Sequence, residues 1–172
     1  MILAIDIGNT NTVIGCCRDD EILFVERLST DSSRTVLEYA ISIKNVLELY
    51  QIRPDDLKGS IISSVVPPLT NLFREAISKI IGKEPMVVGP GVKTGLNILM
   101  DNPGQVGSDL IVNAVAALAE HPVPLIIIDL GTATTISVVD SKKNYIGGMI
   151  LPGIRVSLDS LVNRTSQLHR IS

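Results

Sequence analysis

The stretch IDIGNTNT at residues 5–12 decides the fold, because the chain repeats it as IDLGTATT at residues 128–135. A short apolar run precedes each copy, ILAI at residues 2–5 and LIII at residues 125–128. Each copy leads into another β-prone run, which predicts two hairpins. An Asp at a strand end, a Gly one residue on, and then hydroxyl and amide side chains suit a phosphate and its metal ion. Two such turns facing each other would hold a nucleotide.

An ordinary hairpin is the alternative interpretation of the first copy, since Gly8-Asn9 is a common turn pair. The second copy favours ligand binding, because chance rarely repeats an Asp-x-Gly turn after an apolar strand. The Asp6 carboxylate can hold Mg²⁺ directly or through water, since Mg²⁺ prefers a few oxygen ligands and keeps several waters. Gly8 lets the backbone approach a phosphate, and Asn9 and Thr10 offer hydrogen bonds to its oxygens.

The composition bounds the class of protein. With 172 residues, of which 45% are hydrophobic, the chain suits one large domain or two small ones. A net charge of −3 and only 3% aromatic residues argue against a nucleic-acid partner. Cys16 and Cys17 are neighbours, so on a strand they point to opposite faces, and reduced thiols in the core are expected. With no signal peptide and no apolar run of membrane-spanning length, we expect a soluble, cytoplasmic protein without a membrane partner.

The spacing of apolar and turn residues predicts an alternation of strands and helices. Strands are expected at residues 2–6, 12–17, 22–29, 61–66, 86–88, 125–129, 134–139 and 144–151. Helices are expected at residues 35–50, 67–81, 109–120 and 154–162. The order βββ-α-β-α-β is thus followed by a second βββ-α. We therefore expect duplicated domains, the first at residues 1–112 and the second, incomplete, at residues 113–172.

Two of the expected helices carry residues of interest. Ser108 or Asp109 could cap the helix over residues 109–120, and Asp109 could instead be a general base aimed at a substrate hydroxyl. The helix over residues 154–162 presents Ile154, Leu158, Leu161 and Val162, which form either a core face or a dimer contact. His121 and His169 have no partner at a functional spacing and are expected on the surface.

With these pieces in place, the sequence resembles the type III pantothenate kinases over essentially its whole length. The resemblance rests on the stretches 6–11 (DIGNTN), 63–68 (SSVVPP), 88–96 (VGPGVKTGL), 101–103 (DNP), 111–117 (IVNAVAA), 129–135 (DLGTATT) and 147–153 (GGMILPG). Each stretch is weak alone, but together they are highly specific. That family belongs to the acetate and sugar kinase/Hsc70/actin superfamily. The resemblance implies an α/β fold of duplicated ribonuclease-H-like (actin-like ATPase) domains, the first with a mixed five-stranded sheet.

The resemblance implies a function as well. Members of the family transfer the γ-phosphate of ATP to the hydroxyl of pantothenate, the first step of coenzyme A biosynthesis, and they are homodimers. It implies that ATP phosphates and Mg²⁺ are bound by residues Asp6, Ile7, Gly8, Asn9, Thr10, Asn11, Thr12 and Val13. It also implies a nucleotide contact for Thr132, a monovalent cation (K⁺ or NH₄⁺) at Asp129, and Asp109 as the proton acceptor. The segment Gly107, Ser108, Asp109 and Leu110 matches the pantothenate-binding segment.

The chain departs from the family pattern at the substrate. The family has Arg where Leu110 stands and usually has Tyr, which also faces pantothenate, where Met100 stands. A further substrate-binding Thr and the adenosine-side segment of the family would lie beyond Ser172. Three hypotheses follow. The first is a pantothenate kinase. The second is a catalytically weakened nucleotide-binding relative with a regulatory role, like the Bvg accessory factors. The third is a kinase for another small hydroxy compound.

Overall fold

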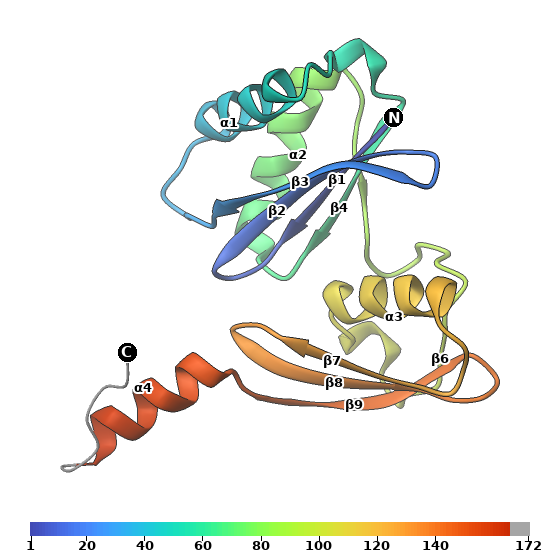
Figure 1. The fold of residues 1–172 in the computed structure, drawn as a ribbon. Helices are drawn as coiled ribbons and strands as arrows, with labels where there is room; N and C mark the ends of the chain where they lie inside the picture. The colour runs from blue at the N-terminus through green and yellow to red at the C-terminus, as the bar shows by residue number, and fades with distance from the viewer. Residues whose placement is uncertain (166–172) are drawn as a thin grey trace. The chain divides into compact units, whose positions relative to one another are not determined.

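The computed structural model describes residues 1–165, and their contacts divide the chain into two compact units, Met1–Val92 and a second unit from Lys93 (Figure 1). This boundary lies twenty residues before the predicted one between 112 and 113. The predicted boundary falls inside a helix, α3 (Ser108–Glu120), whose apolar residues pack on the second unit's sheet, so it cannot separate two units.

The first unit has the predicted order βββ-α-β-α-β. Its elements are β1 (Ile2–Ile7), β2 (Asn11–Arg18), β3 (Glu21–Ser29), α1 (Val36–Leu49), β4 (Gly59–Ser64), α2 (Pro67–Ile81) and β5 (Met86–Val87). A short 3₁₀ turn, Pro54–Asp56, precedes β4. The strands form one sheet in the order β3-β2-β1-β4-β5, antiparallel from β3 to β1 and parallel from β1 to β5. The expected mixed five-stranded sheet is therefore confirmed.

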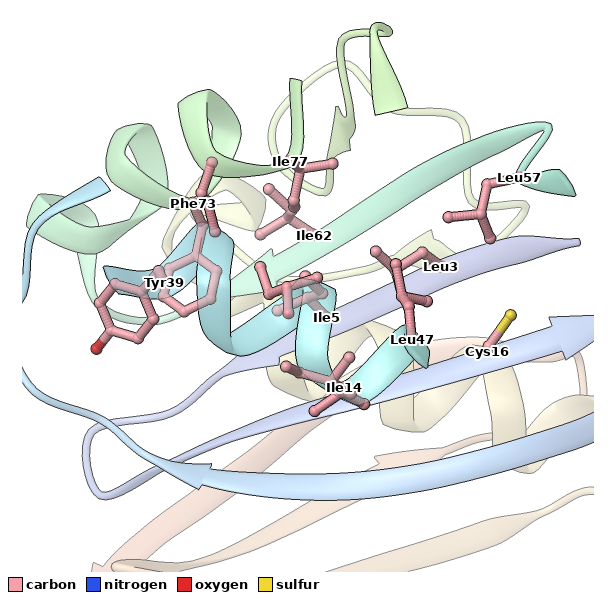
Figure 2. Packing of buried hydrophobic residues seen from close by; sticks show 14 of the residues in the cluster. Leu3, Ile5, Ile14, Cys16, Tyr39, Leu47, Leu57, Ile62, Phe73 and Ile77 are labelled. Carbon is pink, nitrogen blue, oxygen red and sulfur yellow. The ribbon is translucent and has the colours of Figure 1, made fainter. Parts of the chain in front are cut away.

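The core of the first unit lies between this sheet and its two helices. Leu3, Ile5 and Ile7 alternate along β1 and are buried, as period-two side chains of a covered face should be. Figure 2 shows side chains of α1 and α2 converging over that face. The ring centroids of Tyr39 and Phe73 lie 4.3 Å apart. The Tyr39 hydroxyl donates a hydrogen bond to the Asp31 carbonyl at 2.8 Å. The apolar side chains thus fix β1, and with it the turn that follows.

The second unit repeats the βββ-α order after a short leading segment. Its elements are β6 (Asn97–Ile98), α3 (Ser108–Glu120), β7 (Leu125–Leu130), β8 (Ala133–Val139), β9 (Asn144–Pro152) and α4 (Ile154–Arg164). A 3₁₀ turn, Pro103–Gln105, precedes α3. The sheet order is β6-β9-β8-β7, with α3 lying against β7 and β8 (Figure 1). The strand β6, which pairs in parallel with β9, escaped prediction because two residues are too few to show a period.

One face of the second sheet carries exposed apolar side chains among the described residues. Ile128 pairs with Ile136 of β8, which pairs in turn with Met149 of β9, so all three share a face. The exposed members are Ile126, Ile128, Leu130, Met149 and Leu151. The opposite face meets α3 through the buried Ala114, Val139 and Tyr145. An exposed apolar face of this kind marks a surface that normally contacts another segment of the protein or another subunit.

Smaller predictions have mixed outcomes. The N-cap of α3 is Gly107, so neither Ser108 nor Asp109 caps that helix, and both stand in its first turn. Cys16 is a free thiol in the core, whereas the free Cys17 is only half-buried, beside a register shift in β2. His121 is exposed at the end of α3, and His169 lies outside the described residues. Within residues 1–165, every helix is too short or too polar to span a bilayer.

Candidate functional site

The turn between β1 and β2 is closed by backbone and hydroxyl hydrogen bonds. The Gly8 amide donates to the Asn11 carbonyl at 3.0 Å, and a Cβ on Gly8 would stand 3.0 Å from that same oxygen. Thr30, which follows β3, donates its hydroxyl to the Gly8 carbonyl at 2.7 Å and its amide to the Thr10 carbonyl at 3.0 Å. The first acidic turn is therefore held in one shape by the end of β3.

The predicted nucleotide-binding residues of this turn fall into two groups. Asp6, Asn9 and Thr10 are exposed to solvent. Ile7 and Thr12 are buried, and the Thr12 hydroxyl lies 2.9 Å from that of Thr30. Ile7 and Thr12 can therefore offer a phosphate only backbone groups. Gly8, Asn11 and Val13 are partly buried.

Polar residues of β4 lie beside this turn. In the parallel register, Ser63 is next to Asp6 and Ser64 is next to Ile7. The Ser64 hydroxyl accepts from the Val66 amide at 3.1 Å and from the Thr70 hydroxyl at 2.9 Å. The carboxyl ends of β1 and β4 thus place Asp6 and two serines at one sheet edge, where α/β folds bind ligands.

The second acidic turn is one residue shorter than the first, and it has its own closing bond and an additional close contact. The Gly131 amide donates to the Ala133 carbonyl at 3.0 Å, two residues on, whereas the Gly8 amide donates to the Asn11 carbonyl, three residues on. The buried Gly153, between β9 and α4, donates its amide to the Thr132 carbonyl at 3.1 Å. A Cβ at Gly153 would run into the carbonyl groups of Gly131 and Thr132. The turn can therefore sit against the start of α4 only because residue 153 is glycine.

One side-chain hydrogen bond joins α3 to the end of β7, just before the second acidic turn. The Asn113 amide donates to the Asp129 Oδ2 at 3.2 Å. Asp109 precedes Asn113 by four residues, so both lie on one face of α3. Asp109 also stands in the first turn of α3. Sequence reasoning gave Asn113 no role, although its spacing from Asp109 was a usable signal.

A cavity of about 350 Å³ opens beside the start of α3. Two of its lining residues are Met100 and Leu110, the two positions where the chain departs from the family pattern. The other apolar residues that line it are Val106, Ile136, Met149 and Ile150. The polar residues that line it are Asp101, Asn102, Gln105 and Tyr145. Leu110 follows Asp109 in α3, but Asp109 is not among the residues that line this cavity.

Neither candidate metal ligand, Asp6 or Asp129, belongs to a cluster of metal-binding side chains among the described residues. Among residues 1–165, no three His, Cys, Asp or Glu side chains gather closely enough to hold a metal ion together. A single exposed carboxylate in a unit, such as that of Asp6, still fits Mg²⁺, which is usually held by one or two carboxylates, waters and substrate phosphates. Asp129 keeps one oxygen that does not accept from Asn113, which fits a loosely held monovalent cation.

The structure thus assembles each half of the predicted site separately. Asp6 to Val13 belong to the first unit, whereas Met100, Gly107 to Leu110, Asp129 and Thr132 belong to the second. A joint grip of the two acidic turns on one polyphosphate stays a prediction. Thr30 and the β4 serines were not foreseen, because only the folded sheet brings them beside residues 6–13.

Comparison with known proteins gives one family. The type III pantothenate kinase family matches residues 2–172. A type III pantothenate kinase from Halalkalibacterium halodurans is 46% identical over 171 residues, which are 99% of this chain and 67% of that protein. This agreement covers the whole chain and includes both acidic turns.

Solved structures support the fold class. A Ppx/GppA phosphatase from Aquifex aeolicus has a TM-score of 0.53 at 14% identity, covering 97% of this chain and 56% of its own. A proposed N-acetylglucosamine kinase from Porphyromonas gingivalis has a TM-score of 0.53 at 16% identity, covering 87% of this chain and 47% of its own. At such identities the likeness concerns the fold alone, and it confirms the ribonuclease-H-like class. The chain spans about half the length of these structures.

Proposed function

The chain belongs to the type III pantothenate kinase family, and we propose that the whole protein transfers the γ-phosphate of ATP to a hydroxyl of pantothenate or a close relative. The observation that carries this proposal is the start of α3. There Asp109 stands in the first turn of α3, and the next residue, Leu110, lines a cavity large enough for a small substrate. A kinase of this family uses ATP, and the two acidic turns supply the groups that suit its phosphates.

Each residue has a distinct part in the proposed reaction. The acceptor hydroxyl loses its proton to Asp109 as its oxygen bonds to the γ-phosphorus and ADP leaves. Asn9, Thr10 and the backbone of residues 6–13 orient the phosphates, and Thr132 contacts the nucleotide from its own turn. When bound, Mg²⁺ neutralises charge on the phosphates, and Asp6 is its candidate ligand. Asp129 is the candidate ligand of K⁺ or NH₄⁺.

The proposal includes a homodimer. Among the described residues of α4, none is buried, although the helix carries Ile154, Val156 and Leu161. Exposed apolar side chains at the end of a bare sheet face favour the dimer contact over a core face. A cytoplasmic location stays a prediction from the sequence.

The test compares Asp109→Asn with the unchanged full-length protein in a coupled ATP assay, with and without pantothenate. Loss of the base should lower kcat by about 10²–10⁴-fold and leave nucleotide binding intact. Glu120→Gln, at the other end of α3, is the matched control and should keep full activity. Unchanged phosphorylation by Asp109→Asn would remove Asp109 from the role of base.

A catalytically weakened, nucleotide-binding relative is the second candidate. Met100 and Leu110 favour it, because both remove polar contacts from the cavity. Losing a hydrogen bond from a charged donor typically costs about 1.5–3 kcal/mol. Tight ATP binding without turnover of any hydroxy compound would support this candidate instead.

A further inference from the structure

The hydroxyl of Thr30 has a fixed place in a series of hydrogen bonds at the first acidic turn. Thr30 donates its single hydroxyl proton to the Gly8 carbonyl at 2.7 Å. The Thr12 hydroxyl lies 2.9 Å from the Thr30 hydroxyl, and because the Thr30 proton is already used, Thr12 donates to Thr30. The Thr12 side chain is completely buried. The series of bonds therefore runs in one direction, from Thr12 through Thr30 to the Gly8 carbonyl, and its first member is shielded from water.

Thr30 is itself held by backbone hydrogen bonds to the turn and to the core. Its amide donates to the Thr10 carbonyl at 3.0 Å. The next residue, Asp31, donates its amide to the Tyr39 hydroxyl at 2.9 Å, and its carbonyl accepts from that hydroxyl at 2.8 Å. Tyr39 is completely buried in the core of the first unit (Figure 2). The Thr30 hydroxyl therefore has a defined position, which limits how far the Gly8 carbonyl can move.

The bond from Thr30 sets the orientation of the peptide group between Gly8 and Asn9. That peptide group is planar and trans, so its N–H, which belongs to Asn9, points opposite to the Gly8 carbonyl. Because the carbonyl faces the Thr30 hydroxyl, the Asn9 N–H points away from Thr30. A hydrogen bond accepted by the carbonyl also polarises the peptide group and makes its N–H a stronger donor. A fixed and polarised backbone N–H suits a phosphate oxygen.

We infer that Thr30 is a positioning residue for the nucleotide phosphates and that it acts through the peptide group between Gly8 and Asn9. The inference rests on the proposed function, in which residues 6–13 hold the phosphates of ATP. Thr30 acts without touching a phosphate, because its hydroxyl is bonded to the Gly8 carbonyl. Loss of this hydroxyl should therefore weaken the contacts with the polyphosphate and leave the contacts with pantothenate unchanged.

The experiment compares Thr30→Val, which keeps the shape of the side chain and removes the hydroxyl, with Thr30→Ser, which keeps the hydroxyl. In the full-length enzyme, Thr30→Val should raise KM for ATP by about three- to tenfold and change KM for pantothenate by less than about twofold. Thr30→Ser should keep KM for ATP within about twofold of the unchanged enzyme. Ser42→Ala, which removes a hydroxyl bonded to the Glu38 carbonyl in α1, is the control and should leave both KM values unchanged. An unaltered KM for ATP in Thr30→Val, or a Thr30→Ser variant as impaired as Thr30→Val, would overturn the inference.

Binding calorimetry with ATP and adenosine tests for a purely structural role of Thr30. Thr30→Val should weaken binding of ATP by about three- to tenfold and binding of adenosine, which has no phosphate, by less than about twofold. An equal loss for both ligands would indicate a general disturbance of the fold and would overturn the inference. If the unchanged enzyme binds ATP but phosphorylates no hydroxy compound, the proposed function fails, and these affinities alone decide the inference. A full-length enzyme that does not bind ATP would overturn both.

Discussion

Ile5 and Ile128 hold the same position in the two hairpins, one residue before the acidic side chain, yet Ile5 is 2% exposed and Ile128 is 60% exposed. Ile5 pairs with Ile14 and lies under α1 and α2. Ile128 pairs with Ile136, and no described helix covers their face. The two units therefore share a strand pattern and differ in what covers it.

This difference predicts unequal costs for the same substitution. Ile5→Ala should destabilise the 172-residue chain by about 2–5 kcal/mol, because it leaves a cavity in a packed core. Ile128→Ala should change the stability by no more than about 0.5 kcal/mol, as at other exposed sites. Urea denaturation of both variants measures the two values. Equal losses would mean that the second face is covered after all.

The hydrogen bond between Asn113 and Asp129 predicts that a variant of Asn113 has a changed potassium requirement. Asn113→Ala removes the amide that holds Asp129 Oδ2, so the carboxylate loses its fixed orientation. If Asp129 serves a monovalent cation, the KCl concentration for half-maximal activity of the full-length enzyme should rise by about tenfold, the equivalent of one hydrogen bond to a charged group. Ser157→Ala, on α4, is a control outside this contact. An unchanged potassium requirement would separate Asn113 from the cation site.

Much of the fold could be predicted because local chemistry and tertiary structure agree. The turns after Asp6 and Asp129 follow strands of strict apolar pattern, so their positions were predicted to within about two residues. The N-cap of α3 was not, because Gly107 stands in the extended conformation just before Ser108. The predicted domain boundary also differs from the one in the structure. Placing it requires knowing which sheet α3 packs on, and the sequence alone does not identify that sheet.

The site was predicted less completely than the fold. Repeated motifs identify residues near a ligand, but not the residues that hold them. Thr30 reaches the Gly8 carbonyl from the end of β3, and Asn113 reaches Asp129 from α3. Both contacts arise from tertiary packing between segments 22 and 16 residues apart. No local sequence pattern in either segment predicts these two contacts.

Glu38 predicts a pH dependence of stability in the first unit. The Thr35 amide and hydroxyl donate to the Glu38 carboxylate in a capping box at the start of α1. The hydrogen bond from the Thr35 amide, followed by that from its hydroxyl, lowers the pKa of Glu38 below its ordinary 4.5. A lowered folded-state pKa gives stability that is present above the unfolded value and is lost as pH falls through the folded value.

The unchanged chain should therefore exceed Glu38→Gln in its urea midpoint at about pH 7, and the difference should shrink below about pH 4. The effect should be small and should weaken with salt, because the carboxylate is exposed. Thr35→Ala provides the partner for a double-mutant cycle at each pH. A difference that does not change with pH would show that the carboxylate's charge has no part in the cap.

Gly153 predicts the sharpest structural effect of a single methyl group. A Cβ there would overlap the carbonyl groups of Gly131 and Thr132. These are backbone groups, which cannot rotate away as a flexible side chain can. Gly153→Ala should therefore displace either the second acidic turn or the start of α4, destabilising the second unit by about 1–3 kcal/mol. In the full-length enzyme the same variant should weaken ATP binding, because Thr132 moves with its carbonyl. Gly89→Ala is the control, since a Cβ at Gly89 meets no atom within 4 Å. Normal stability and ATP affinity in Gly153→Ala would show that the turn tolerates a wider separation from α4, so that close packing would not explain a glycine at that position.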